Sequence, residues 1–595
     1  YDAFREGRKV QKKWVIAAKR ADFTGIAKRF GIDQVTARII RNREVVGDED
    51  IDRYLHGTKE DLHDPAQMKD IKAAAELLQQ KIKEKKRIRI LGDYDIDGIQ
   101  SVYLLYSALS RCKANVDYVI PDRIADGYGV NERLVRQAKG DGIDTLLPCD
   151  NGIAAYQEIA LAKELGMTVI ITDHHEVPYE EKAGKRIYRV PPADAVVNPK
   201  QPDCPYPFKK LCGAAVAFKL IQVLYRNLGF PAEDAFVYLE NVAVATVGDV
   251  MDLQGENRIL VKEGLKALNH TKNYGMRALA ARNQIPPGTI KAYHIGFVLG
   301  PCLNASGRLD TAKRALEMLL AEDEQRAAEY AGDLYDLNAS RKELTEQGVQ
   351  QAIWLVEQME ETDKVLVLYL PDCHESLAGI IAGRIREKYN RPVFVLTDSE
   401  DGVKGSGRSI EEYSMYEEMT KCRELFTKYG GHPMAAGLSL PQEHVETFRR
   451  ALNENTSLTE EDLRGKIVID VPMPLAYISK ELIEELNILE PFGKSNEKPV
   501  FADKEIEILS MRILGKNRNV CKMQVKGAGS QVIPAVYFGE TEVFLDFLEE
   551  KYGKHALMQA MEGEGSGITV SFVYYPEINS YNGRENIQIV VKNYC

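Results

Sequence analysis

The first third of the chain alternates between two kinds of hydrophobic pattern. Short apolar runs of strand length are separated by segments in which apolar residues recur every three or four positions. The longer segments predict helices over 70–85 and 101–111 and helices that begin near 131 and 154. The short runs predict strands over 87–91, 116–120, 145–150, 168–172 and 195–198. Strands separated by helices of this length predict a parallel sheet in an α/β fold.

The flanking regions show different patterns. Residues 1–70 predict a cap of short helices over 9–19, 23–30 and 34–46. A charged, helix-favouring stretch over 316–360, with predicted helices at 321–335 and 340–359, lacks Gly/Pro runs and is interpreted as a connector helix.

A second α/β unit is predicted after the connector, over 361–460. Its predicted strands cover 364–370 and 392–397, and a helix covers 378–389.

From about 465 the pattern becomes β, with strands over 466–471, 505–514, 519–525, 531–538, 567–575 and 586–591 and one helix over 542–552. Short strands with one intervening helix favour an OB-type barrel over 461–595, whose aromatic residues Tyr537, Phe538, Tyr574 and Tyr575 are divided between core packing and base stacking. The α/β lobe before the connector covers 71–315.

Composition places the chain among ordinary globular proteins. It has 595 residues, 44% hydrophobic and 28% charged, which is enough for about three to five domains. There is no apolar run of about 18 residues to span a bilayer and no recognisable secretory signal, although the first residue is Tyr1. The nine cysteines are scattered without a C-x-x-C pair, so we expect a reducing, cytoplasmic location and neither disulfides nor a thiolate zinc site.

The net charge of −11 conceals a local contrast. Residues 1–46 contain twelve Lys/Arg and five Asp/Glu. These basic residues are interpreted first as solvated faces of the helical cap and second as nucleic-acid contacts. Because salt confines each charge's influence to about 10 Å, an acidic protein can still bind a polyanion through one cationic groove.

Acidic side chains gather where the predicted strands end. Asp93, Asp95 and Asp97 follow the first strand at alternate positions, Asp150 follows another, and Asp173-His174-His175 follow a third. Asp249 comes after an apolar helix over 235–247. Ligands in parallel sheets bind outside the carboxyl ends of the strands, so these residues are expected to converge. The alternative for the first motif alone is a solvated Asp-rich turn.

The ligand types favour a pair of hard divalent cations. Carboxylates with imidazole suit Mn²⁺ or Mg²⁺, and several like charges require more than one ion. Two ions bridged by a carboxylate activate water for displacement at phosphorus. We assign the bridge to Asp150, a metal contact to His174 and a phosphate or outer contact to His175, although the two histidines could exchange roles. The catalytic candidates are therefore Asp150, His174 and His175.

These segments resemble a known family. Asp95-Ile96-Asp97-Gly98, Asp150-Asn151-Gly152, Asp173-His174-His175 and Val247-Gly248-Asp249 are similar to the ordered motifs of the DHH phosphoesterases. Gly430-Gly431-His432 with Ala435-Ala436-Gly437 resembles the associated DHHA1 domain. Together with Asn304-Ala305-Ser306-Gly307-Arg308, Gly405-Ser406-Gly407-Arg408-Ser409 and Leu489-Glu490-Pro491-Phe492-Gly493, the order and spacing resemble the RecJ family over nearly the whole chain.

The resemblance implies a single-strand-specific 5′→3′ exodeoxyribonuclease of DNA repair and recombination. It implies that Asp95, Asp97, Asp150, His174 and Asp249 hold two metals and that Asp93 is the first acid of a D-x-D-x-D form. Leu91 stands where some relatives have histidine, and Gly248 where many have alanine. Arg123 and Arg308 resemble arginines that recognise a terminal and a scissile phosphate.

The second lobe adds candidate phosphate contacts. Its two glycine-rich motifs offer exposed N–H groups, hydroxyls, a guanidinium and an imidazole for an anion, or are ordinary turns. The substrate-binding candidates of the whole chain are Arg123, His175, Asn304, Arg308, Ser406, Arg408, Ser409, Gly430, Gly431 and His432.

Two other functions stay open. One is a DHH phosphodiesterase that acts on short RNA or cyclic dinucleotides, and the other is a non-catalytic protein of the same fold. For the exonuclease we expect single-stranded DNA as partner, a single-strand-binding protein or a helicase as protein partners, no membrane and a monomeric state.

Overall fold

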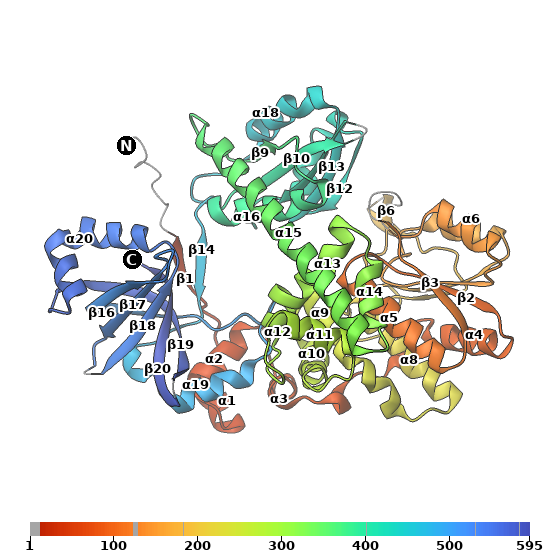
Figure 1. Cartoon of the computed structure of the whole chain (residues 1–595), viewed down its shortest axis with the longest axis horizontal. Helices are drawn as coiled ribbons and strands as arrows, with labels where there is room; N and C mark the ends of the chain where they lie inside the picture. Colours follow the sequence, from red (N-terminus) through yellow and green to blue (C-terminus); the bar gives the residue numbers. More distant parts are fainter. Residues whose placement is uncertain (1–11, 123–128, 183, 400–401, 530, 582) are drawn as a thin grey trace. The chain divides into compact units, whose positions relative to one another are not determined.

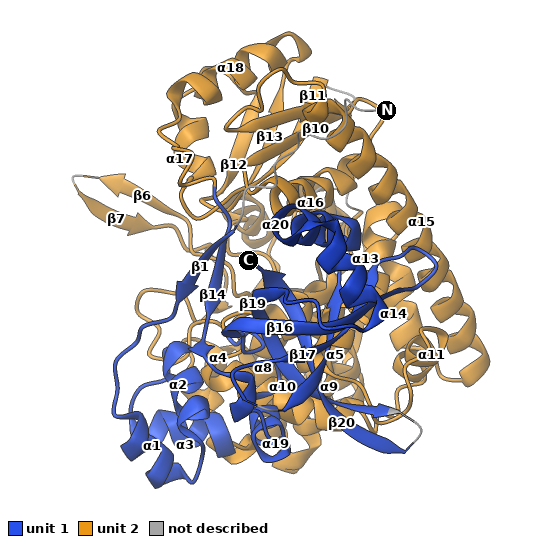
Figure 2. Cartoon of the chain, turned by 90° about the vertical axis from the view of Figure 1, so that its left-hand side faces the viewer, with its two compact units in different colours: residues 1–56, 464–492, 496–595 blue, residues 57–463, 493–495 orange. Residues whose placement is uncertain are grey.

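The computed structural model describes residues 12–122, 129–182, 184–399, 402–529, 531–581 and 583–595 (Figure 1). The chain forms two compact units (Figure 2). The barrel unit contains residues 1–56, 464–492 and 496–595, and the two-lobe unit contains residues 57–463 and 493–495. The two-lobe unit is therefore an insertion within the barrel unit.

The first lobe of the two-lobe unit contains the predicted parallel sheet, which confirms the α/β class. The sheet order is β3 (Asn115–Val119), β2 (Arg87–Leu91), β4 (Thr145–Pro148), β5 (Thr168–Thr172) and β8 (Ala195–Val197), all parallel. Successive strand side chains point to opposite faces, so Leu147 joins one core cluster and Leu146 another. The helices around the sheet are α4 (Ile71–Lys83), α5 (Ile96–Arg111), α6 (Glu132–Gly140), α7 (Tyr156–Glu164) and α8 (Gly213–Leu228).

A helical layer follows the sheet and leads into the connector. Its main helices are α9 (Leu239–Gly248), α10 (Gly255–Leu268), α11 (Tyr274–Arg282), α13 (Gly300–Leu309) and α14 (Lys313–Leu319). The connector is one helix of 34 residues, α15 (Glu324–Glu357), where the sequence predicted two. Asn338, between the two predicted helices, is buried, and its amide lies 3.3 Å from Cys302 Sγ. Packing therefore stabilises the helix through its most polar stretch.

The second lobe is a mixed sheet in the order β12 (Lys428–His432), β13 (Ala435–Leu440), β11 (Gly402–Arg408), β10 (Val393–Ser399) and β9 (Leu366–Tyr369). Its helices are α16 (Ala378–Tyr389), as predicted, α17 (Met415–Thr420) and α18 (Val445–Asn455). The alternative that the two glycine-rich motifs are ordinary turns is wrong, because they lie in β11 and β12. A Cβ added at Gly405 would lie 2.3 Å from Leu396 Cδ2, and one at Gly407 would lie 2.6 Å from Met415 Sδ. Glycine at these two positions permits close packing.

The barrel unit confirms the predicted C-terminal barrel. Its strands are β16 (Phe501–Leu514), β17 (Val520–Lys526), β18 (Val532–Phe538), β20 (Arg584–Tyr594) and β19 (Thr569–Tyr581), and the pairing of β16 with β19 closes the barrel. A short strand, β15 (Val471–Pro472), pairs in parallel with the start of β16, and α20 (Thr541–Glu562) contains a kink at Gly553. Tyr574 is fully buried, whereas Phe538 is 61% exposed. Tyr574 therefore belongs to the core and is excluded from base stacking.

The N-terminal segment belongs to the barrel unit. The prediction of a helix over 9–19 is wrong for the described residues, because β1 (Lys13–Ile16) pairs in parallel with β14 (Lys466–Ile469). Helices α1 (Phe23–Phe30), α2 (Gln34–Asn42) and α3 (Asp48–His56) follow, and Ile39, Ile40 and Leu55 pack in the barrel core. The expected cap over 1–70 is thus divided near residue 56.

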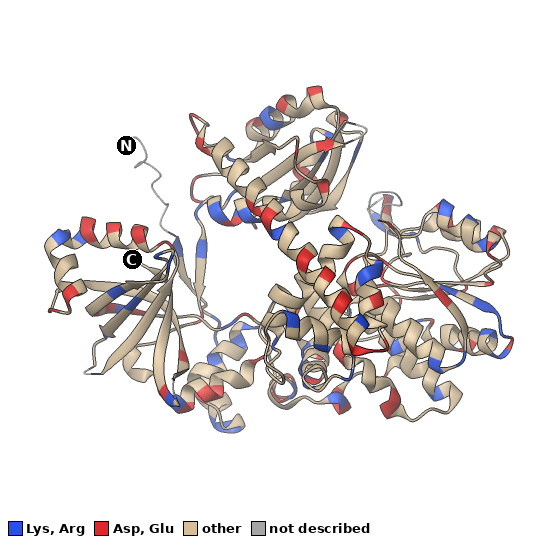
Figure 3. Cartoon of the chain, viewed as in Figure 1, with Lys and Arg blue, Asp and Glu red and all other residues tan. Residues whose placement is uncertain are grey.

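Basic residues of this segment make ion pairs inside the barrel unit. Arg43 lies 2.6 Å from Asp470, and Arg29 pairs with Asp48 at the start of α3. Figure 3 shows charges of both signs on these helices. The pairs favour a structural role for the basic residues. Among the described residues, no helix has the length and apolar character needed to cross a membrane.

One element was not predicted from the sequence. Strands β6 (Tyr179–Lys182) and β7 (Lys185–Tyr188) form a hairpin between β5 and β8, visible in Figure 2. All eight strand residues are exposed. A hairpin without a buried face lacks the apolar alternation that reveals strands in a sequence.

A buried ion pair stabilises the two-lobe unit. Lys219 on α8 lies 2.6 Å from Glu256 on α10, and both side chains are excluded from solvent. Glu256 also accepts hydrogen bonds from Tyr206 Oη and from the His63 backbone N–H, while Lys219 Nζ donates to the His63 carbonyl at 3.0 Å. The network attaches the start of the unit to its helical layer.

We expect Lys219→Met to lower the free energy of unfolding of the two-lobe unit by about 3–5 kcal/mol, because Glu256 keeps a buried charge without its partner. Urea denaturation followed by circular dichroism measures this difference. The control is Lys266→Met, at an exposed lysine whose partner Glu263 is half-buried, and it should cost less than about 1 kcal/mol. Equal losses of unfolding free energy in the two variants would contradict the view that burial makes the Lys219–Glu256 pair important.

Candidate metal centre

The three aspartates after β2 turn the chain directly into a helix. Asp95 caps α5, because its Oδ1 accepts hydrogen bonds from the N–H groups of Asp97 and Gly98, each at 3.0 Å. The Ile96 N–H donates to Asn304 Oδ1 at 2.8 Å. Helix α5 thus begins five residues before the predicted start at 101. Asn304, predicted to bind substrate, holds the backbone of this motif.

A second helix N-terminus fixes Asp97. The backbone N–H groups of Gly213 and Ala214, the first residues of α8, donate to the Asp97 carboxylate at 2.6 and 2.8 Å. A Cβ added at Gly213 would lie 2.6 Å from Asp150 Oδ1. The sequence analysis missed both donors. The available signal was the run of small residues that opens an apolar helix, Gly213-Ala214-Ala215.

Asp150 follows β4 in an unusual backbone conformation. Its φ is 60°, in the left-handed region that residues with a Cβ rarely adopt. The next residue, Asn151, donates from Nδ2 to the carbonyls of Leu91 and Cys149 and so joins the ends of β2 and β4. This local arrangement fixes the buried Asp150 carboxylate beside Gly213.

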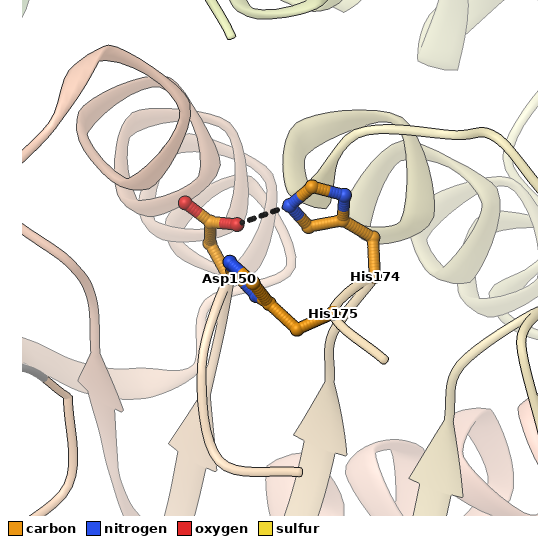
Figure 4. A group of neighbouring side chains, drawn as sticks. All are labelled: Asp150, His174 and His175. Carbon is orange, nitrogen blue, oxygen red and sulfur yellow. Dashed lines mark ion pairs between the residues drawn. The ribbon is translucent and has the colours of Figure 1, made fainter. Parts of the chain in front are cut away.

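His174 faces this carboxylate group. Its Nε2 lies 3.1 Å from Asp150 Oδ1, 3.6 Å from Asp97 Oδ2 and 3.7 Å from Asp249 Oδ2. Figure 4 shows the His174 ring pointing toward Asp150, with His175 beside it. Residues from four separate segments therefore converge, as the sequence predicted from the strand ends.

His175 occupies a different position. Its side chain is 46% exposed, and Nδ1 lies 2.8 Å from Oδ1 of the buried Asp173. Asp173 also accepts hydrogen bonds from the backbone N–H groups of Ile153 and His174. Although burial acts against it, hydrogen bonding to Asp173 raises the pKa of His175 to about 9. Burial acts to raise the pKa of Asp173, but the hydrogen bond with His175 lowers that pKa below its usual value.

The carboxylates repel one another in a buried environment. Burial, followed by the charge of Asp97, raises the pKa of Asp150 well above its ordinary value and raises that of Asp95. The same causes raise the pKa of Asp249 to about 8. Burial lowers the pKa of His174, which favours the neutral imidazole that binds metals.

The donor atoms form three overlapping groups, in each of which they lie within 4.8 Å of one another. The groups are Asp150 with His174 and His175, Asp97 with His174 and Asp249, and Asp93 with Asp95 and Asp150. This is a hard-oxygen set with one or two imidazoles, and it fits Mn²⁺ or Mg²⁺. Asp150 belongs to two of the groups.

Family models match three parts of the chain. The DHH family N-terminal domain matches residues 87–246, the DHHA1 domain matches 362–457, and the RecJ OB domain matches 469–593. The chain is 34% identical over 586 residues to the single-stranded-DNA-specific exonuclease RecJ of Bacillus subtilis, covering 98% of this chain and 70% of that protein. It is 33% identical to the Haemophilus influenzae exonuclease of that name, covering 93% of this chain and 95% of the relative.

The chain belongs to the RecJ family. A solved RecJ structure in complex with Mn²⁺, from Thermus thermophilus, has a TM-score of 0.80 and 27% identity, and the match covers 98% of this chain and 79% of that one. The Mg²⁺ complex of the same RecJ has a TM-score of 0.74 and 26% identity, with 98% and 78% covered.

A pocket of about 490 Å³ in the two-lobe unit joins the loop over residues 93–97, the metal loop, to the second lobe. Tyr94, between two of the motif aspartates, lines it together with residues of the mixed sheet. The predicted residues Ser406 and Gly430 contribute to its wall, as do Lys404 and Lys428, which the sequence analysis did not single out. The only signal that could have indicated these two lysines is the alternation of exposed and buried positions along β11 and β12.

The other predicted contacts are spread more widely. Arg308 donates to the Ser376 carbonyl at 2.8 Å, across the two lobes of the unit. Arg408 packs against Gly379, and Gly431 and His432 are exposed at the end of β12. Ser409 is buried, and its hydroxyl donates to the Tyr413 carbonyl, which argues against direct substrate contact. Arg123 lies outside the described residues.

We expect Asp150→Asn to leave the melting temperature of the metal-free protein equal or higher, because it removes one buried like charge. It should also remove most of the stabilisation by Mn²⁺, which for the unmodified chain is about 2.7 kcal/mol at 100 times Kd. Thermal melts with and without MnCl₂ measure both effects. Asp203→Asn, at an exposed pair with Lys69, should retain the full Mn²⁺ effect. An equal Mn²⁺ effect in Asp150→Asn would argue against a ligand role.

Proposed function

We propose that this chain is a single-stranded-DNA-specific exonuclease that hydrolyses phosphodiester bonds with two divalent metal ions, Mn²⁺ or Mg²⁺. The observation that carries the proposal is the convergence of carboxylates and His174 at the ends of the parallel strands. The RecJ relatives are named as single-stranded-DNA-specific exonucleases, which supports single-stranded DNA as the substrate of this chain. The 5′→3′ direction and a role in DNA repair and recombination follow from family membership.

The residues of the site have separate roles in this proposal. Asp93, Asp95, Asp97, Asp150, His174 and Asp249 would hold the ions, which, when bound, supply an activated water and neutralise charge at phosphorus. Asp150 would be shared between the two ions: it belongs to two donor groups, as His174 does, but its carboxylate has two oxygens to offer. Asp173 positions His175, whose exposed ring faces the substrate side and donates a hydrogen bond to a phosphate oxygen.

The pocket beside Tyr94 gives the strand a path between the lobes. Lys428 places positive charge on its wall, and the backbone at Gly430 permits close approach of a phosphate. Lys404 lies on the same wall, paired with Glu375 at 2.9 Å, and would exchange that partner for a phosphate. Arg308 contributes a guanidinium near the junction of the lobes. We further propose a monomer that cooperates with a single-strand-binding protein or a helicase. The nine free thiols favour a cytoplasmic location.

The second candidate function is a phosphodiesterase for short RNA or cyclic dinucleotides, since the metal centre alone does not set substrate length. The closed barrel favours the longer substrate, because barrels of this type bind extended single strands.

We expect the protein with Mn²⁺ to release nucleotides from a 5′-labelled single strand much faster than from a duplex or from a dinucleotide. Asp150→Ala should reduce the rate by at least about 10²-fold, because it removes a preorganised ligand for developing charge. Gel analysis of 5′- and 3′-labelled strands measures rate and direction. Asp203→Ala serves as the matched control. Preference for the dinucleotide would support the second candidate function instead.

We expect Lys404→Ala with Lys428→Ala to weaken single-strand binding and to make the slope of log K against log salt less steep by about 0.7 per lysine. Each lysine that contacts a phosphate releases counterions, and its removal abolishes that release. Fluorescence anisotropy at several salt concentrations, with Ca²⁺ in place of Mn²⁺ to prevent cleavage, measures the slope. Lys421→Ala, at an exposed lysine whose partner Glu418 is half-buried, should leave the slope unchanged. An unchanged slope in the double variant would exclude this pocket as the path.

A further inference from the structure

A helical segment of the two-lobe unit presents two aromatic rings to solvent. The segment consists of α12 (Ala292–His294), the π-helical turn η4 (Ile295–Leu299) and α13. Tyr293 is 63% exposed and Phe297 is 69% exposed. Their ring centroids lie 5.1 Å apart with an interplanar angle of 29°, so the rings stack on each other. We call this pair the aromatic step. Large apolar side chains grouped on a surface in this way mark a binding site more often than isolated ones do.

The other side of the same segment is fixed against the metal centre. A Cβ added at Gly296 would lie 3.8 Å from Val247 Cγ1, two residues before Asp249. A Cβ added at Gly300 would lie 3.3 Å from Ile96 Cδ1, between Asp95 and Asp97. The segment therefore contacts the last turn of α9 and the first residue of α5, next to the candidate ligands Asp249, Asp95 and Asp97. The helical segment that carries the aromatic step thus packs beside the metal centre.

The backbone near the aromatic step departs from regular geometry. The π-helical turn holds one additional residue per turn, and such turns are rare and frequent at functional sites. Val250, directly after Asp249, adopts a φ of 55° and is 60% exposed. A β-branched residue in the left-handed region is unfavourable, and such strain concentrates where ligands bind. These features add to the exposed rings as independent signs of a site.

We propose that the aromatic step stacks an unpaired base of the single strand and so positions the strand for the metal centre. The proposal rests on the proposed function. Exposed aromatic faces bind bases of any sequence, because every base has a π-face. An interior base of a duplex is already stacked on both sides and cannot lie on the rings, so the aromatic step also contributes to discrimination against duplex. The segment that carries the aromatic step contacts the metal centre through Gly296 and Gly300, which favours a base over a protein partner as the ligand of the rings.

Abasic scanning tests this role. A fluorescent single strand carries one abasic site, moved one nucleotide at a time, and its Kd is measured by anisotropy with Ca²⁺ replacing Mn²⁺. For the unmodified protein, we expect one abasic position to raise Kd by roughly 5- to 100-fold. In the variant Tyr293→Ala with Phe297→Ala, the intact strand should bind more weakly by a similar factor. In that variant, the abasic site at this position should cause no further loss.

Two control variants separate stacking from damage to the fold. Tyr293→Phe with Phe297→Tyr keeps both rings and should retain the abasic profile of the unmodified protein. Trp354→Ala removes another exposed aromatic ring, 58% exposed on α15, and should leave the profile unchanged. Melting temperatures of all variants identify any unfolded protein. A folded alanine double variant that keeps both the affinity and the abasic profile would overturn the proposal and leave the rings as a protein-binding surface.

The same experiment distinguishes this proposal from the proposed function. If the unmodified protein neither binds nor digests a single strand, the proposed function fails. If it binds and digests the strand but shows no sensitive abasic position, only the aromatic step fails as a base-binding site.

Discussion

Mutual repulsion among buried carboxylates is the constraint on which the first lobe depends. The carboxylates of Asp97 and Asp150 are almost fully buried and lie in one cluster with Asp93, Asp95 and Asp249. The surrounding structure compensates with backbone dipoles: two N–H groups of α8 hold Asp97, and the first N–H groups of α5 hold Asp95. A divalent cation would complete the compensation that these donors begin.

The same constraint explains the local geometry of several small residues. Gly213 permits α8 to approach Asp150, and a Cβ added at Gly248 would lie 2.6 Å from Ile96 Cδ1. Glycine at 248 is therefore matched to the isoleucine within the first motif. Asn304 then holds the backbone of that isoleucine from α13, so the metal loop is restrained from both the sheet side and the helical layer.

Much of the first lobe could be predicted from the sequence, because its strands are buried on both faces and its helices are amphipathic. Strand β5 and helix α16 have the predicted bounds, and the candidate ligands converge because parallel strand ends share one edge. Three features could not be predicted. The pairing of β1 with β14 joins residues about 450 positions apart, Gly405 and Gly407 serve tertiary packing, and the N–H donors to Asp97 belong to the backbone. Each depends on a neighbour that only the fold supplies.

The division of the barrel unit between the two ends of the chain sets an order of events during synthesis. The parallel partner of β1 is β14, which leaves the ribosome about 450 residues later, or on the order of 20 to 90 s at ordinary elongation rates. By the end of that interval the two-lobe unit has nearly all of its residues and can fold, whereas β1 is still an unpaired strand. Unpaired strands are sites of mispairing between chains. A nascent chain therefore depends on keeping β1 in solution until β14 has been synthesised.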